Sequence, residues 1–256
     1  MAILEAVNLK KSFGGVVAVD NLSFSVETGQ IKSIIGPNGA GKTTVYNLIT
    51  GLLPPTSGLI RFNGQTITGL KTHTIASLGL ARTFQNVRLF ENMTVLENVM
   101  VGCHQRMGSG LFSAICRLPK FRREEKQTAA VALEKLALVG LADQSQRPAF
   151  SLPFAQQRTL EIARALAAEP RMILLDEPAA GLNSHETVQL GKLILKIRQM
   201  GLTVLLVEHD MELVMDISEE ILVINYGKKI AEGKPAEIQD NQEVIKAYLG
   251  EDFKGR

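Results

Sequence analysis

The sequence predicts an α/β fold: a mostly parallel central sheet, an antiparallel β layer near the N-terminus and an inserted α-helical subdomain. Four short segments are dense in Val, Ile and Leu, as in strands buried on both faces, at residues 31–35, 172–175, 203–207 and 221–224. Helix-compatible stretches lie between them, at residues 43–50, 124–138, 156–168 and 186–200. From about residue 85 to 150 the buried-strand signal disappears and helix-compatible sequence takes over, which indicates the insertion.

The antiparallel layer is predicted from alternation near the N-terminus. Apolar side chains alternate with serines in residues 22–26, and with Arg and Asn in residues 60–63. This period of two is typical of strands with one exposed face. Within the insert we expect an irregular, exposed outer part at residues 108–123, because two glycines and a proline interrupt it. A short helix is expected at residues 242–249.

The composition excludes several classes of protein. Of the 256 residues, 45% are hydrophobic, and 28 Lys and Arg stand against 26 Asp and Glu, which indicates a globular chain rather than a disordered one. The formal net charge of +2 argues against a strongly basic nucleic-acid binder, so we expect no nucleic-acid partner. No segment approaches the roughly 18 uninterrupted apolar residues of a spanning helix, and we do not expect the chain to cross a membrane.

The strongest motif fits G-x-x-x-x-G-K-[ST] and lies between a predicted strand and a predicted helix. Its glycines let backbone N–H groups approach phosphate oxygens, and the start of the following helix favours an anion. Lys42 can reach the β- and γ-phosphates of a nucleotide, and the Thr43 hydroxyl can bind Mg²⁺. The expected ATP-binding residues of this loop are Gly36, Pro37, Asn38, Gly39, Ala40, Gly41, Lys42, Thr43 and Thr44.

A pair of carboxylates follows the predicted strand 172–175. Because that end of a strand faces the ligand crevice in an open α/β sheet, Asp176 can hold Mg²⁺, and Glu177 can deprotonate the water that attacks the γ-phosphate. Such a pair is also common as simple loop polarity, but the phosphate loop favours the catalytic interpretation. Roughly 130 residues separate Lys42 from Asp176, against about 30 in a simple βαβ unit, so a domain must be inserted between them.

Three further residues lie at the edges of this site, and two of them have an ordinary alternative. His209 follows the predicted strand 203–207 and so falls at the same sheet edge, although a loop histidine is often structural or solvated. Gln85 stands where the α/β core gives way to the helical insert. Phe13 can stack on an adenine or belong to the core.

Together these motifs resemble an ATP-binding cassette (ABC) ATPase of the P-loop NTPase class, and the resemblance covers essentially the whole chain. It implies one cassette domain over residues 1–256. The α/β core is expected at residues 1–84 and 160–256, and the helical subdomain with the signature motif at residues 85–159.

The resemblance also implies roles for individual residues. It identifies residues 36–43 as the Walker A loop, 172–177 as Walker B and 180–183 as the D-loop. ATP and Mg²⁺ are the implied cofactors. The residues expected to be catalytic are Glu177, the switch histidine His209 and Lys42; those expected to bind Mg²⁺ are Thr43, Gln85 of the Q-loop and Asp176; Phe13 and Gln85 are also expected to bind the nucleotide.

The signature motif departs from the family pattern. Where the family ordinarily has Leu-Ser-Gly-Gly-Gln, this chain has Leu152, Pro153, Phe154, Ala155 and Gln156, which are expected to complete a nucleotide site. Pro153 offers neither the hydroxyl nor the N–H of a serine, and Ala155 adds a Cβ where close backbone approach is wanted. Our hypothesis is that the ATP site completed by this signature is the weaker of two. The alternative is that Pro153 simply starts the signature helix with good geometry.

Within the superfamily, four segments are similar to the larger ATPase subunit (LivG type) of branched-chain amino acid importers: residues 81–90, the insert through 121–123, 155–164 and 244–250. This resemblance implies a head-to-tail dimer with a second ABC ATPase subunit, expected to be a homologous chain. It also implies two membrane permease subunits, an extracytoplasmic substrate-binding protein and a peripheral location on the cytoplasmic face of the cell membrane.

Two alternative functions stay open at this point. The chain can serve another ABC transporter, for amides, urea or export, because nothing in it contacts the transported substrate. It can also be a soluble cassette ATPase without a transport role. Such proteins usually carry two cassettes or long coiled-coil inserts, whereas this chain has one cassette and a short insert.

Overall fold

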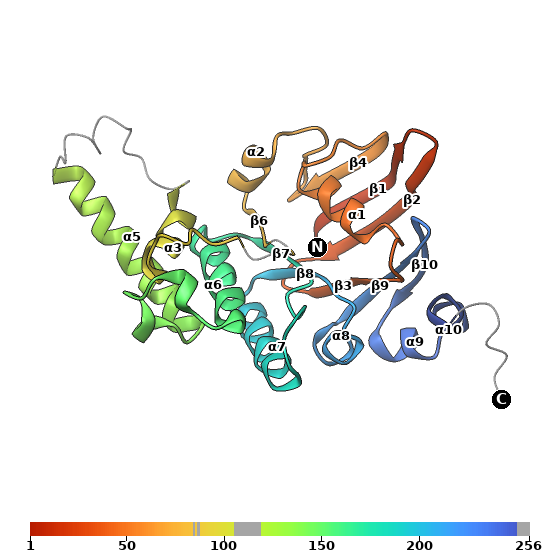
Figure 1. Cartoon of the computed structure of the whole chain (residues 1–256). Helices are drawn as coiled ribbons and strands as arrows, with labels where there is room; N and C mark the ends of the chain where they lie inside the picture. Colours follow the sequence, from red (N-terminus) through yellow and green to blue (C-terminus); the bar gives the residue numbers. More distant parts are fainter. Residues whose placement is uncertain (84, 86–87, 105–118, 250–256) are drawn as a thin grey trace.

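The computed structural model describes residues 1–83, 85, 88–104 and 119–249 (Figure 1). Its strands form two sheets. The first contains, in spatial order, β2 (Val16–Glu27), β1 (Ala2–Phe13), β4 (Ser57–Phe62) and β5 (Gln65–Thr66). The second contains, in spatial order, β10 (Lys228–Gly233), β9 (Glu220–Asn225), β3 (Ile31–Ile35), β8 (Thr203–Val207), β7 (Met172–Asp176) and β6 (Leu80–Arg82).

The second sheet is the predicted, mostly parallel core. β3 pairs in parallel with β8 on one side and β9 on the other, β8 with β7, and β7 with β6. β10 runs antiparallel along β9 at one edge. All five residues of β3, of β7 and of β8 are buried, which confirms the dense strands expected from the sequence. Because parallel strands end on the same side, the carboxyl ends of β3, β7 and β8 meet at one edge of the sheet.

The first sheet is the predicted antiparallel layer. β1 pairs with β2 and β4, and Leu22, Phe24 and Val26 of β2 point into the core, as the alternation indicated. β1 was not predicted, because its register shifts after Ala6 and Asn8 adopts a left-handed backbone with φ 48°. A bulge of this kind breaks the period of two on which the prediction depends.

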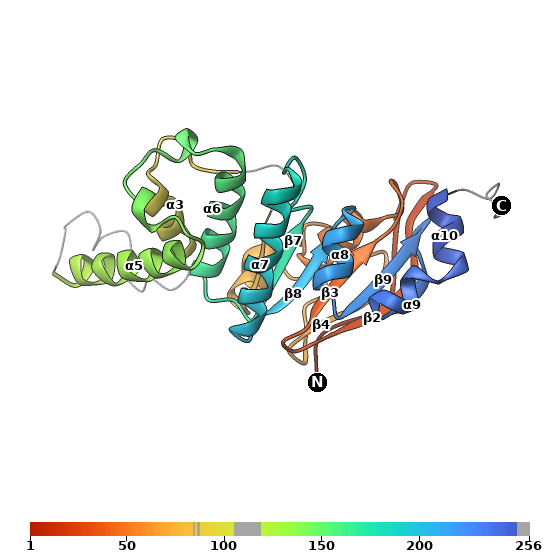
Figure 2. The ribbon, with the colours of Figure 1, turned by 90° about the horizontal axis from the view of Figure 1, so that it is seen from below.

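Apart from α2, which contacts β6, the helices lie in three places around the sheets (Figures 1 and 2). α1 lies between the two sheets, α7 to α10 cover the other face of the core sheet, and α3, α5 and α6 pack together beside the sheets. In the described part of the chain, no helix is both long and apolar enough to cross a membrane. The helices are α1 (Lys42–Ile49), α2 (Thr72–Ser77), α3 (Val95–Gly102), α5 (Pro119–Leu138), α6 (Phe154–Ala167), α7 (Ser184–Gln199), α8 (Met211–Ile217), α9 (Pro235–Gln239) and α10 (Gln242–Leu249), with short 3₁₀ turns η2 (Ala142–Gln144) and η3 (Ala149–Ser151).

Side chains of the core strands alternate between two hydrophobic clusters. On β8, Leu205 and Val207 pack toward α1 and the antiparallel layer, whereas Val204 and Leu206 pack toward the covering helices. A third cluster joins α3, α5 and α6. The expected domain boundary at 159/160 falls inside α6, whose later residues contribute to both the second and the third cluster. The division into core and subdomain stays a prediction.

One expectation about the insert was wrong. Residues 119–123 are not irregular, because α5 begins at Pro119. Proline suits the first turn of a helix, where its missing N–H has no partner to lose. The rest of that expectation, residues 108–118, lies outside the described residues.

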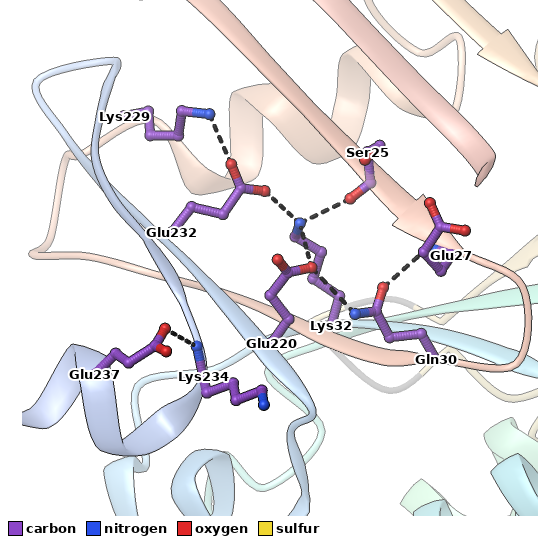
Figure 3. A network of polar contacts seen from close by, with 9 residues as sticks. All are labelled: Ser25, Glu27, Gln30, Lys32, Glu220, Lys229, Glu232, Lys234 and Glu237. Atoms are coloured by element: carbon purple, nitrogen blue, oxygen red, sulfur yellow. Dashed lines mark hydrogen bonds and ion pairs between the residues drawn. The ribbon is translucent and has the colours of Figure 1, made fainter. Parts of the chain in front are cut away.

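A buried lysine joins both sheets (Figure 3). Lys32 of β3 is 1% exposed, and its Nζ donates to the carbonyl of Ser25 on β2 at 2.7 Å. The same ammonium pairs with Glu220 of β9 at 2.9 Å and with Glu232 of β10. Lys229 also pairs with Glu232, at 2.6 Å. Burial alone would raise the pKa of Glu232, but the two lysines outweigh it and leave that pKa below its usual value.

Candidate functional site

The predicted phosphate loop, residues 36–41, joins the end of β3 to the start of α1. Gly39 and Gly41 have φ angles of 80° and 104°, a region that disfavours side chains. A Cβ on Gly41 would lie 2.5 Å from the carbonyl oxygen of Ala18 on β2, so the loop passes too close to its neighbours for anything but glycine. The first turn of α1 carries no acidic side chain, which leaves the helix N-terminus free for an anion.

Lys42 is the first residue of α1 and is 7% exposed. Its Nζ donates to the carbonyl oxygens of Gly36 at 2.6 Å and Pro37 at 3.1 Å. Burial lowers the pKa of Lys42, while the negative charge of Glu177 acts in the opposite direction. The ammonium therefore rests on the phosphate loop, near the carboxylate of the Walker B strand. The next residue, Thr43, is exposed at the helix start.

Asp176 is the last residue of β7 and is 3% exposed. Burial raises the pKa of Asp176 to about 6, although Arg82, whose Nη2 lies 3.6 Å from its Oδ2, lowers that pKa. The carboxylate is thus held in a desolvated place where its ionised form is costly. Such a group favours a cation beside it.

Glu177 turns the chain out of the strand. Its φ of 46° is unusual for a residue with a side chain, and its N–H donates to the carbonyl of Val207 on β8 at 2.8 Å. Gln85 Nε2 donates to Glu177 Oε2 at 2.9 Å, and His209 Nδ1 lies 3.9 Å from the same oxygen. The structure thus brings together three predicted site residues from loops that follow β6, β7 and β8.

Two residues of this region were not found from the sequence. Arg82 of β6 pairs with Asp176, and its Nη1 donates to Asn47 Oδ1 at 3.1 Å and Thr50 Oγ1 at 3.0 Å on the α1 side. Arg82 lies three residues before Gln85, but an arginine in a three-residue edge strand gives no pattern that distinguishes it.

The second is Glu208, which is fully buried directly after β8. Its carboxylate accepts hydrogen bonds from the N–H groups of Ala179 at 2.7 Å, His209 at 3.0 Å and Asp210 at 3.4 Å. Burial raises the pKa of Glu208, against the effect of these hydrogen bonds. Glu208 therefore ties the loop after Glu177 to the backbone of His209. Its position at the same sheet edge as the histidine is the signal that could have indicated it.

The atypical signature lies at the start of α6. Pro153 is the N-cap residue and makes no side-chain cap, and Phe154 is the first helical residue. The Phe154 ring packs against Gly181 of the D-loop, where an added Cβ would lie 3.0 Å from it, and the Arg158 guanidinium lies 5.2 Å from the ring centre. The signature is therefore connected to the D-loop of its own chain.

The remaining signature residues lie away from the phosphate loop. Leu152 is buried in the helical cluster, and Gln157 Nε2 donates to its carbonyl at 2.9 Å. Pro153, Ala155 and Gln156 line a groove of about 720 Å³ against α7, whose lining contains no phosphate-loop residue. Within this chain the structure does not bring the predicted signature and the Walker A loop together.

Two predicted residues have roles that the geometry leaves as predictions. Phe13 ends β1 with 46% of its surface exposed, and Lys11 Nζ lies 5.0 Å from its ring centre. Asn183 of the D-loop caps α7. Its side-chain Oδ1 accepts a hydrogen bond from the N–H of Glu186 at 3.0 Å, and Glu186 Oε2 accepts one from the N–H of Asn183 at 3.0 Å. Asn183 and Glu186 therefore form a reciprocal capping box at the start of α7.

The residues expected to bind Mg²⁺ fit a hard cation. A hydroxyl, an amide oxygen and a carboxylate are the oxygen ligands that Mg²⁺ prefers, and the burial of Asp176 raises its pKa despite the ion pair with Arg82. Among the described residues, no group of three or more His, Cys, Asp or Glu could hold a metal ion. A site with so few charged ligands suits an ion that is also bound by substrate phosphates.

A phosphate loop at the start of α1 and an acidic pair at the same sheet edge define the class of P-loop nucleotide hydrolases. A family model described as "ABC transporter" matches residues 19–180, and one described as "Branched-chain amino acid ATP-binding cassette transporter" matches residues 228–254. The chain therefore belongs to the family of ATP-binding proteins of ABC transporters.

Individual relatives are similar over nearly their whole length. The chain is 50% identical over 250 residues to the high-affinity branched-chain amino acid transport ATP-binding protein BraF of Pseudomonas aeruginosa, covering 97% of this chain and 98% of that protein. It is 48% identical, with the same coverage, to LivG of Salmonella typhimurium, which has the same description. A solved ATP-binding cassette of an ABC transporter, in its ADP conformation, has a TM-score of 0.86 and 32% identity, covering 98% of this chain and 100% of that one. These findings confirm the predicted cassette fold and the resemblance to LivG-type proteins.

Proposed function

We propose that the chain is the ATP-hydrolysing subunit that energises import of branched-chain amino acids. The observation that carries this proposal is the identity of 50% and 48%, over nearly the whole chain, to two ATP-binding proteins of high-affinity branched-chain amino acid transport. The match of residues 228–254 to a model of the same transporter type supports it.

In the proposed mechanism Glu177 is the general base. Gln85 and His209 approach its Oε2 from two other loops, which restricts the carboxylate to one direction. A carboxylate fixed in this way can orient a water and accept its proton while the water oxygen attacks the γ-phosphate. His209, whose side chain is 59% exposed, is proposed to stabilise the negative charge on the transferred phosphoryl group.

The phosphate loop and Lys42 are proposed to bind the β- and γ-phosphates. Lys42 Nζ would exchange its two carbonyl partners for phosphate oxygens, a move of one end of a flexible side chain. Thr43, Asp176 and Gln85 would hold Mg²⁺, which when bound neutralises charge on the phosphates. Phe13 is proposed to stack on the adenine through its exposed ring.

The full assembly is proposed to contain a second, homologous ATPase subunit, two permease subunits and an extracytoplasmic binding protein, on the cytoplasmic face of the membrane. Each ATP would lie between the Walker A loop of one subunit and the signature of the other. The separation of this chain's own signature from its own phosphate loop supports that arrangement. The site completed by this chain's signature is proposed to be the weaker one, because Pro153 offers neither a hydroxyl nor an N–H and Ala155 adds a Cβ.

The transport proposal is tested by reconstituting the chain in vesicles with a homologous second ATPase, two permeases and a substrate-binding protein from the same organism. ATP-driven uptake of leucine, isoleucine and valine is expected, and Glu177→Gln is expected to abolish most of it. Uptake of urea or a short amide instead would assign the chain to another importer. If the chain is found only in the soluble fraction of lysed cells, and salt-washed membranes retain none of it with the permeases, a transporter role would be contradicted.

The asymmetry of the two sites has its own test. Glu177→Gln in this chain and the equivalent change in the partner ATPase are compared for leucine uptake. We expect the larger loss from Glu177→Gln in this chain, because its Walker site faces the partner's signature. Equal losses would contradict a weaker second site.

A further inference from the structure

The start of α6 packs on the loop that joins β7 to α7, residues 177–183. Phe154, the first residue of α6, has its ring against Gly181, where an added Cβ would lie 3.0 Å from that ring. Gly181 has a φ of 83°, so its backbone also disfavours a side chain. Figures 1 and 2 show α6 and α7 side by side. The signature helix and the D-loop of one chain are therefore in direct contact.

Arg158, one turn further along α6, makes the second contact with this loop. It is 6% exposed, and its guanidinium lies 5.2 Å from the centre of the Phe154 ring. Its Nη2 makes a long hydrogen bond of 3.5 Å to the carbonyl of Ala180. Burial lowers the pKa of Arg158, whereas four carboxylates that include Glu208 and Glu177 act against this. One buried cation thus contacts both the signature ring and the D-loop.

The loop is a compact turn that begins at the proposed general base. The N–H of Ala180 donates to the carbonyl of Glu177 at 3.1 Å, and the N–H of Leu182 donates to that of Ala179 at 3.0 Å. The N–H of Ala179 is held by the buried carboxylate of Glu208 at 2.7 Å. Ala180 and Glu177 therefore belong to one hydrogen-bonded turn, and a displacement of Ala180 moves the backbone that carries the Glu177 carboxylate.

Glu177 depends on support from its surroundings. Its φ of 46° lies in the left-handed region, and a residue with a side chain keeps such a backbone only where neighbouring groups hold it. Its N–H donates to the carbonyl of Val207 at 2.8 Å, and its own carbonyl accepts from Ala180. The second of these two hydrogen bonds comes from the residue whose carbonyl accepts from Arg158.

We propose that Phe154 and Arg158 are positioning residues for Glu177. They act through the D-loop residues Ala180 and Gly181. This inference rests on the proposed role of Glu177 as general base. A glycine at position 154 could make neither ring contact, so the departure of this signature from the family pattern gives the chain a contact with its own catalytic loop. The motif then serves two sites: it completes the partner's ATP site and it holds the general base of its own.

The first test is hydrogen exchange of the loop in the purified full chain without nucleotide. Phe154→Leu keeps an apolar side chain but removes the ring, and Phe154→Tyr keeps the ring. Phe150 precedes the same helix and is 62% exposed, so Phe150→Leu is the matched control. Amides of residues 179–183 should exchange about threefold faster, or more, in Phe154→Leu, while those of residues 31–35 in β3 stay unchanged. Phe154→Tyr and Phe150→Leu should match wild type.

The second test isolates turnover at the ATP site that contains Glu177. In the reconstituted transporter, the glutamate of the partner ATPase that corresponds to Glu177 is replaced by Gln. The remaining hydrolysis then takes place at a site that the partner's signature completes, which Phe154 does not touch. Phe154→Leu should lower kcat about three- to tenfold and change KM for ATP less than about twofold. Phe154→Tyr should restore kcat.

The outcomes separate this inference from a direct effect on the partner's ATP. Unchanged exchange of residues 179–183 in Phe154→Leu would overturn it, as would equally fast exchange in Phe150→Leu. A loss of kcat only in the reverse arrangement, with Glu177→Gln in this chain and an intact partner, would mean that Phe154 acts on the partner's ATP alone. If the wild-type transporter does not hydrolyse ATP, the proposed function is wrong, and the exchange experiment decides whether the loop is held in this way.

Discussion

Replacing Asp176 by Asn should make the nucleotide-free protein more stable at pH 8 while removing its activity. The carboxylate is 3% exposed at the end of β7, and burial raises its pKa from 3.8 to about 6. A raised acid pKa means that the folded state binds the proton more tightly than the unfolded state. The stability that this proton contributes is present below about pH 4 and is lost as the pH rises through about 6.

The magnitude follows from the shift. At about 1.4 kcal/mol for each pKa unit, a rise from 3.8 to about 6 corresponds to about 3 kcal/mol of folding free energy lost at pH 8. Asn resembles the neutral acid in size and charge, so Asp176→Asn should recover about 1 to 3 kcal/mol there. Arg82 keeps its hydrogen bonds to Asn47 and Thr50 in the variant, which limits the cost of removing its charged partner.

The assay is urea unfolding of wild type and Asp176→Asn, without metal or nucleotide, at pH 5 and pH 8. The variant should be more stable at pH 8, and the difference should shrink at pH 5, where wild-type Asp176 is largely protonated. A variant that is less stable at pH 8, or a difference of the same size at both pH values, would refute the reasoning. A loss of ATP hydrolysis in the same variant would link the desolvated carboxylate to function.

Three other changes test the packing around the site. Lys32→Met leaves Glu232 without its buried counter-ion and should lower the free energy of unfolding, measured with urea, by about 2 to 4 kcal/mol. The lowered pKa of Glu232 contributes stability that is lost as pH falls, so the variant should lose less stability than wild type on acidification. An unchanged dependence of stability on pH would contradict this. Glu208→Gln places an amide N–H opposite the backbone N–H groups of Ala179 and His209, which can then no longer both be accepted. This change should lower kcat at least tenfold and leave KM nearly unchanged. A change in KM alone would argue against a role of Glu208 in positioning Glu177 and His209. Gly102→Ala would press a Cβ into the α6 backbone and should lower the free energy of unfolding by about 1 to 3 kcal/mol. Gly15→Ala, where the space is open, is the control and should change stability very little. Equal Tm values for the two variants would show that α3 can move aside.

The central strands could be predicted because each is buried on both faces. β3 and β8 have the same bounds as the dense segments 31–35 and 203–207. The helices α1, α6, α7 and α10 lie within two residues of the predicted segments 43–50, 156–168, 186–200 and 242–249, whereas α2, α3, α8 and α9 were not predicted as separate helices. α5 was placed too late, at residue 124, because its first turn contains a proline and several charges that hide the apolar period.

The edges of both sheets could not be predicted in the same way. β6 has three residues, two of them half-buried, and β1 carries a bulge at Asn8, so neither shows a regular pattern. The site was found where a motif or a strand end marked it. Glu208 and Arg82 escaped because their importance comes from partners that lie 29 to 94 residues away in the sequence.

The pairing of Lys32 also constrains how the chain is made. Its carboxylate partners follow it by 188 and 200 residues, and β8 and β9, which flank it, come equally late. At about 5 to 20 residues per second, a ribosome needs roughly 10 to 40 s to synthesise that interval. Through this time β3 lacks both of its neighbours, β8 and β9. The phosphate loop that follows β3 also lacks the turn between β9 and β10, whose Gly227 N–H donates to the carbonyl of Ala40 in the loop. The nascent chain therefore completes its nucleotide site only after its C-terminal segment has left the ribosome, so an early stop in translation yields no partly active ATPase.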